Sequence, residues 1–159
     1  MKLLAIILAW AALFFVVPPA HATTTEQALA ALCPGHEELA PLVDIAARRH
    51  LQHPVHIIAV MATESNCRMN VVGAHGEICA MQIMPNGPAA NGLTRKQLRD
   101  PATCIATGAR WLALRQVDCG GLFLGFGGYN ARKCGNGKGY ARKVMGMIAK
   151  AWKVIGGER

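Results

Sequence analysis

Six cysteines are the feature of this chain that most constrains its fold: Cys33, Cys67, Cys79, Cys104, Cys119 and Cys134. They all follow an N-terminal segment with the pattern of a secretory signal peptide. In that segment Lys2 precedes an apolar run from Leu3 to Val17, and the small residues Ala20 and Ala22 mark a cleavage site after Ala22. Because disulfides persist in compartments reached by export, we expect all six cysteines to be paired.

The spacing of the cysteines gives no sign of a metal site. No two of them form a C-x-x-C pair, and the histidines are not placed at zinc-ligand distances along the chain. We therefore expect neither a metal nor a cofactor. Sequence leaves the connectivity of the disulfides open, and our preferred pairing joins Cys67 to Cys79, Cys119 to Cys134 and Cys33 to Cys104. The first two bridges would each close a short loop beside a candidate site segment.

Removal of residues 1–22 as a signal peptide leaves residues 23–159, a length that suits one compact domain. The apolar run is shorter than the roughly 20 residues that cross a bilayer as a helix, although an uncleaved anchor is the alternative. We expect an exported protein, periplasmic or secreted, that acts as a monomer.

The exported part carries a strong positive charge. It has 16 basic and 9 acidic residues, a net charge of +7, and eight of the basic residues lie between Arg132 and Arg159. Such a bias favours polyanionic partners. Export makes nucleic acid a poor partner, whereas cell-wall carboxylates or an anionic membrane surface lie in the right compartment. A merely solvated basic face is the alternative.

Hydrophobic periodicity predicts a mainly helical domain. Helical spacing covers residues 41–51 and 54–65, returns after Asp100 and Pro101, and covers a last helix from Tyr140 to Ala151. Residues 71–84 lack this period and are rich in glycine and β-branched residues, which predicts a small β-hairpin or irregular β segment. Residues 23–36 form a short segment of mixed polarity before the first predicted helix, and residues 120–128 form a glycine-rich stretch.

One acidic side chain stands apart from the other eight. Glu64 follows Ile57, Val60 and Met61 at helical spacing, so it ends an apolar stripe. Partial burial would raise the pKa of its carboxyl group, and a glutamic acid that keeps its proton near neutral pH can protonate a leaving oxygen. A glutamate that reaches solvent at the helix end is the alternative reading from periodicity alone.

Neighbouring motifs connect Glu64 to a family. In order along the chain they are Glu64-Ser65, Ala80-Met81-Gln82-Ile83-Met84-Pro85, Leu98-x-Asp100-Pro101 with Ile105, Gly108, Trp111 and Leu112, Tyr129-Asn130-Ala131, and Tyr140-Ala141-x-x-Val144. Each block is weak alone. The ordered set, over about residues 40–150, resembles the lytic transglycosylases whose catalytic domain is of the soluble-lytic-transglycosylase (SLT) type.

The resemblance implies a lysozyme-like α+β domain whose cleft binds glycan strands of peptidoglycan. In that family the glutamate protonates the glycosidic oxygen between N-acetylmuramic acid and N-acetylglucosamine. It then acts as base on the C6 hydroxyl of the muramic acid, which yields a 1,6-anhydro end. Glu64 is the matching residue. Small members often accompany secretion, conjugation or pilus machines, and a partner apparatus here is an expectation by analogy.

The resemblance also implies five residues around the substrate. Ser65 would orient the glutamate or a sugar substituent, Met81 and Gln82 would line the cleft, Tyr129 would place its hydroxyl near Glu64, and Asn130 would hold the geometry or contact substrate. For Met81 a place in the core is the alternative.

Two departures from the family pattern concern positions that are glycine elsewhere. Cys79 replaces the glycine of Gly-Leu-Met-Gln, and Arg132 replaces the glycine after Tyr-Asn-Ala, where it would add a positive rim.

Two other functions compete with the transglycosylase reading. A hydrolysing lysozyme of goose type would need a second carboxylate, for which Glu77 is the candidate. A non-catalytic wall-binding or membrane-active protein would have no need of the Glu64-Ser65 pair.

Overall fold

The computed structural model describes residues 22–156, so the predicted signal peptide, apart from Ala22, lies outside the described residues. The elements in this part of the chain are α1 (Thr24–Leu32), η1 (Glu37–Leu39), α2 (Ala40–His50), α3 (Pro54–Ser65), α4 (Arg95–Leu98), α5 (Pro101–Asp118), α6 (Leu122–Ala131) and α7 (Lys138–Ile155). None of these helices has the length and apolar character needed to cross a membrane.

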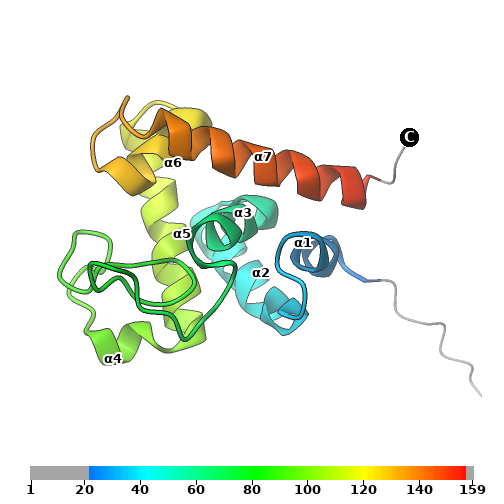
Figure 1. Cartoon of the computed structure of the whole chain (residues 1–159), viewed down its shortest axis with the longest axis horizontal. Coiled ribbons are helices and arrows are strands. Elements are labelled where there is room, and N and C mark those ends of the chain that lie inside the picture. Colours follow the sequence, from blue (N-terminus) through cyan, green and yellow to red (C-terminus); the bar gives the residue numbers. More distant parts are fainter. Residues whose placement is uncertain (1–21, 157–159) are drawn as a thin grey trace, which may run out of the picture.

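Helix α3 lies at the centre of the domain. Pro54 begins it, and the Nδ1 atom of His53 accepts a hydrogen bond of 3.2 Å from the Val55 amide. Every residue from Ile57 to Met61 has no exposed surface. Helices α1, α2, α5 and α7 all contact α3, and Figure 1 shows it surrounded by them. The helix ends at Asn66, whose backbone is left-handed. Glu64 therefore sits where the central helix reaches the surface.

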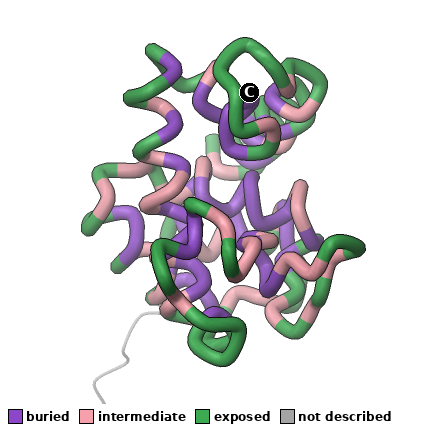
Figure 2. The backbone as a smooth tube through the Cα atoms, turned by 90° about the vertical axis from the view of Figure 1, so that its left-hand side faces the viewer, coloured by how far each residue is buried: buried purple, intermediate pink, exposed green. Residues whose placement is uncertain are grey.

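Helices α5, α6 and α7 build the side of the domain that carries the site. Asp100 caps α5 by accepting a 2.8 Å hydrogen bond from the Thr103 amide, as expected for an Asp before a helix. In α7 one face is buried, formed by Ala141, Val144, Ile148 and Ala151. Figure 2 shows buried backbone where the helices meet and exposed backbone along the loops.

Residues 23–36 and residues 120–128, where the sequence predicts no helix, contain α1 and most of α6. Helix α1 begins with a capping box between Thr23 and Glu26, a signal present in the sequence. Helix α6 contains Gly125, Gly127 and Gly128, which let it pack closely on its neighbours: a Cβ atom at Gly128 would lie 2.8 Å from the Cys119 sulfur. Close helix packing thus overrides the low helix propensity of glycine.

The predicted β-hairpin at residues 71–84 is not formed. The described chain has no strand there, only isolated antiparallel bridges between Val72 and Ile78 and between Ile78 and Ile83. The chain reverses twice within this short segment, and Cys79 and Gln82 adopt left-handed backbone with φ of 67° and 47°. Residues of that conformation interrupt extended backbone. The described domain is therefore mainly helical, with an irregular segment in place of the predicted hairpin, and this corrects the α+β expectation.

All six cysteines are paired, which confirms the prediction of three disulfides. The pairing differs from the preferred one: Cys33 joins Cys67, Cys79 joins Cys104, and Cys119 joins Cys134. Only the third bridge was predicted. Cys33 directly follows α1 and Cys67 lies just beyond α3, so their disulfide joins the C-terminal ends of these two helices. Cys79 lies in the loop that faces the first turn of α5, which carries Cys104. Adjacency in space, rather than short loop length, decides both pairs.

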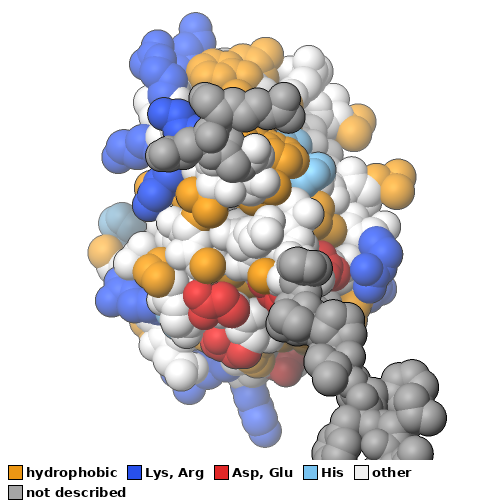
Figure 3. Space-filling model, turned by 90° about the vertical axis from the view of Figure 1, so that its right-hand side faces the viewer, with side chains coloured by type: hydrophobic (Ala, Val, Ile, Leu, Met, Phe, Trp, Pro, Cys, Tyr) orange, Lys and Arg blue, Asp and Glu red, His pale blue; other side chains and the backbone are white. Residues whose placement is uncertain are grey.

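Charge is unevenly distributed over the surface. Lys138, Arg142, Lys143, Lys150 and Lys153 are exposed on α7, which has no acidic residue. On the face drawn in Figure 3, Lys and Arg side chains cluster at the upper left, at the height of α7, with others along the remaining edges, and Asp and Glu side chains lie below the middle.

Candidate active site

A cavity of about 300 Å³ opens beside the end of α3. Three regions contribute to its wall: the C-terminal turn of α3, the loop that precedes α4, and the facing parts of α5 and α6. Its lining residues are Glu64, Ala74, His75, Glu77, Gln82, Ile83, Met84, Gly87, Pro88, Ala89, Trp111, Tyr129, Asn130 and Arg132. The lining combines converging polar side chains with apolar and aromatic ones. Polar groups placed in this way can fix the orientation of a ligand.

The Glu64 carboxyl group has a raised pKa in this cavity. Burial raises its pKa from 4.5 to about 7, the negative charge of Glu77 adds to the rise, and a hydrogen bond from Tyr140 opposes it. The Tyr140 hydroxyl donates that bond to Oε1 over 2.7 Å. Near neutral pH a large fraction of Glu64 is therefore protonated and able to donate a proton, and its conjugate base is held by a neutral hydroxyl.

The second carboxyl group of the cavity belongs to Glu77. Its Oε2 atom accepts a 3.0 Å hydrogen bond from the His75 amide, and its backbone carbonyl accepts one of 2.8 Å from the Gly73 amide. The turn thus holds Glu77 in the wall of the cavity instead of exposing it fully.

Tyr129 fixes the loop that faces Glu64. Its buried hydroxyl donates a 2.8 Å hydrogen bond to the carbonyl of Met81, and its ring stacks on that of Tyr140 with centroids 6.4 Å apart. Burial and the nearby charge of Glu64 raise the pKa of Tyr129 well above its usual range, so it stays neutral. Tyr129 lines the same cavity as Glu64, but its hydroxyl is directed to Met81, and Tyr140 is the tyrosine that forms a hydrogen bond with Glu64.

Four of the six residues expected from the sequence line the cavity: Glu64, Gln82, Tyr129 and Asn130. The amide of Gln82 donates to the Cys79 carbonyl over 2.8 Å, which leaves its other groups facing the cavity. Asn130 is exposed at the end of α6.

Ser65 and Met81 lie behind this wall. The Ser65 hydroxyl is buried and donates to the carbonyl of Ala80 over 2.9 Å, so it ties α3 to the loop rather than facing a ligand. Met81 has no exposed surface and packs against Gly108 of α5. The structure thus places Met81 in the core, the alternative left open by the sequence, because its neighbours Cys79 and Gln82 turn the loop inward.

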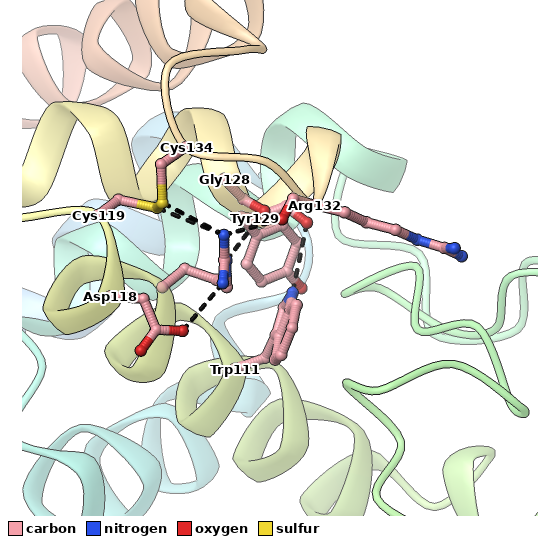
Figure 4. A network of polar contacts seen from close by, with 8 residues as sticks. Trp111, Asp118, Cys119, Gly128, Tyr129, Arg132 and Cys134 are labelled. Atoms are coloured by element: carbon pink, nitrogen blue, oxygen red, sulfur yellow. Dashed lines mark hydrogen bonds and ion pairs between the residues drawn. A yellow bond between two sulfur atoms is a disulfide. The ribbon is translucent and has the colours of Figure 1, made fainter.

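A polar network supports the side of the cavity formed by α5 and α6. Arg115 is buried and donates to the carbonyls of Gly128 and Arg132, over 3.3 Å and 2.9 Å, while its guanidinium lies 5.3 Å from the centre of the Trp111 ring. Trp111 in turn donates to the Tyr129 carbonyl over 3.3 Å. The Cys119–Cys134 disulfide flanks this network, and its sulfur atoms also accept hydrogen bonds from the Arg115 guanidinium (Figure 4).

Sequence reasoning missed two residues of this site. From the sequence, Tyr140 is only the first residue of the last predicted helix and a member of a motif, and Trp111 is only a member of a motif. Each of these side chains has one polar atom on an aromatic ring, and buried Tyr and Trp normally find a hydrogen-bond partner. Their residue type therefore indicates a polar contact. Nothing in the sequence says that the partner of Tyr140 is Glu64, because α7 is far from α3 along the chain.

Comparison with known proteins identifies the family of this chain. Residues 41–144 match the Transglycosylase SLT domain family. Among solved structures, the fold is similar to an inactive mutant of the lytic transglycosylase Slt from Pseudomonas aeruginosa, with 21% identity and a TM-score of 0.56. That match covers 80% of this chain and 23% of the other, so this chain corresponds to a fraction of that protein. No curated protein matches the sequence. Because the family match spans well over half of the chain and includes Glu64, the cavity wall and Tyr140, the chain belongs to the Transglycosylase SLT domain family.

Proposed function

We propose that this protein is a peptidoglycan lytic transglycosylase with Glu64 as its single acid and base. The observation that carries the proposal is the position of Glu64 in the cavity, with a pKa raised to about 7 by burial and a hydroxyl donor at 2.7 Å. Family membership supplies the substrate class. The three disulfides support the proposed export to the periplasm or beyond.

The proposed reaction needs no water. Protonated Glu64 gives its proton to the glycosidic oxygen, the bond from that oxygen to the anomeric carbon breaks, and the N-acetylglucosamine side leaves as an alcohol. The Glu64 carboxylate then takes the proton of the C6 hydroxyl as O6 bonds to the anomeric carbon. Glu64 ends the cycle protonated, and the Tyr140 hydroxyl stabilises its anionic form between the two steps.

Hydrolysis is the second candidate, because Glu77 lines the same cavity as Glu64. In that reading Glu77 would activate a water molecule on the opposite face of the sugar. The His75 amide already donates to one oxygen of Glu77, and the Glu77 side chain packs over Gly73. We therefore favour a role in which Glu77 forms part of the cavity wall and its negative charge raises the pKa of Glu64.

The decisive experiment is digestion of purified peptidoglycan followed by mass analysis of the fragments. We expect 1,6-anhydro-muramic acid ends, lighter by one water than hydrolytic ends. Glu64→Gln should fold normally and lose nearly all cleavage, since an amide cannot protonate the leaving oxygen. A folded Glu64→Gln protein that keeps a tenth of the activity would contradict the assignment.

Glu77→Gln serves as the comparison variant. Below about pH 6, where Glu64 is protonated in both proteins, it should keep most of the activity and the same anhydro products. Reducing muramic acid ends from the wild type, together with loss of cleavage in Glu77→Gln, would replace the transglycosylase with a hydrolysing lysozyme.

A further inference from the structure

Arg132 is the one lysine or arginine among the residues that line the cavity. Two carboxyl groups, those of Glu64 and Glu77, share this wall. A cavity with two acids repels an anionic ligand unless a cation offsets them. Because the proposed substrate carries carboxylates, the position of Arg132 bears directly on which ligand the cavity accepts.

The backbone at Arg132 does not favour a side chain. It ends α6 in the left-handed region with φ of 61°, a conformation that glycine adopts far more readily than arginine. Arg115 donates to the Arg132 carbonyl over 2.9 Å and so holds the backbone in place without using the side chain. Glycine would satisfy this geometry with less strain, so local structure does not account for an arginine here.

The Arg132 guanidinium has no partner within the described residues. No hydrogen bond or ion pair joins it to residues 22–156, and Figure 4 shows its side chain extending away from the network around Arg115. Cys79, another non-glycine residue in the left-handed region, offers a contrast: its side chain is used in the disulfide with Cys104. At Arg132 the side chain remains available to a ligand.

We propose that Arg132 forms a carboxylate-binding subsite of the Glu64 cavity and selects glycan strands that carry acidic groups. The proposal rests on the proposed function for its substrate class. The planar guanidinium can bind a carboxylate through two parallel hydrogen bonds, as a lysine cannot. Two sources supply that carboxylate in peptidoglycan: the lactyl group of muramic acid when no peptide is attached, and the stem peptide when one is.

Binding to inactive protein tests the subsite apart from catalysis. The parent is Glu64→Gln, and its dissociation constants are measured by calorimetry for three ligands: peptide-free glycan strands, strands with stem peptides, and neutral chitin oligomers. Adding Arg132→Gln should weaken binding of at least one acidic ligand roughly tenfold, the order expected for a charge-assisted pair, and leave chitin binding unchanged. The acidic ligand that responds identifies the source of the carboxylate.

Lys133→Gln is the matched control, because it removes the same charge one residue away, outside the cavity lining. Arg132→Gly adds a second readout: it should weaken acidic ligands as Arg132→Gln does, yet melt at or above the temperature of the parent. Equal losses from Arg132→Gln and Lys133→Gln, equal losses for chitin and acidic strands, or no loss at all would overturn the subsite alone. A parent that binds none of the three glycans would overturn the proposed function and the subsite together.

Discussion

Opposed influences set the protonation of Glu64. Burial and the charge of Glu77 raise the pKa of its carboxyl group, while the hydrogen bond from Tyr140 stabilises the anion and lowers it. Tyr140→Phe removes only the lowering contact, so the pKa of Glu64 should rise above about 7. Because the reaction begins from protonated Glu64, the fall of kcat/KM at high pH should move to higher pH in Tyr140→Phe. A pH profile on soluble glycan strands measures the shift.

Tyr129→Phe is the control for that profile, since the Tyr129 hydroxyl donates to the Met81 carbonyl and not to Glu64. It should leave the position of the high-pH limb unchanged and lower the free energy of unfolding by about 1 to 3 kcal/mol, the cost of a buried carbonyl without a partner. Equal displacement of the limb in both variants would show that Tyr140 has no specific effect on Glu64.

At the level of elements, the contact between α5 and the loop at residues 79–83 positions one wall of the site. Gly108 of α5 packs directly on Met81: a Cβ atom there would lie 2.8 Å from the Met81 Cβ. Gly108→Ala should therefore lower the free energy of unfolding by about 1 to 3 kcal/mol, as overpacking of a close-packed core does. Denaturant unfolding of the purified protein checks the value.

Gly146→Ala gives the matched comparison for Gly108→Ala. Gly146 is exposed within α7, and a Cβ atom there would meet nothing within 4 Å. Alanine favours a helix more than glycine does, so Gly146→Ala should raise the free energy of unfolding by up to about 1 kcal/mol. If Gly108→Ala also stabilises the protein, the close contact with Met81 is not a constraint on the fold.

For the whole molecule, Glu64 makes stability depend on pH. Its pKa is about 7 in the folded protein and near 4.5 when exposed, so the folded state holds an extra proton between these values. The contribution of Glu64 to stability is thus complete below about pH 4.5 and is lost as the pH rises towards 7. Glu64→Gln should remove this loss and be more stable than the wild type above pH 7, by up to about 3 kcal/mol.

Urea unfolding of both proteins over a pH series measures this difference. It should vanish below about pH 4, where both side chains are neutral, which gives the experiment an internal control. A difference that stays constant across the series would mean that Glu64 is not desolvated in the folded protein.

Local signals in the sequence predicted much of the helical framework. Pro54 and the apolar run after it gave α3 its observed bounds, and Asp100 with Pro101 gave the start of α5. The sequence predicts a glycine-rich stretch in place of α6 and a β-hairpin around Ile78, and both predictions differ from the structure because these conformations depend on neighbouring elements. In α6 the glycines serve close packing, and around Ile78 two left-handed residues turn the chain before a strand can form.

By itself the sequence determined that this protein has a helical domain with paired cysteines and one acid at the end of an apolar stripe, because these follow from residue type and spacing along one segment. Only the tertiary structure decided which cysteines pair, that Tyr140 rather than Tyr129 binds Glu64, that Met81 lies in the core, and that Arg132 opens onto the cavity. Each of these joins groups from segments distant in sequence, and their meeting depends on how the helices pack around α3, which no local pattern encodes.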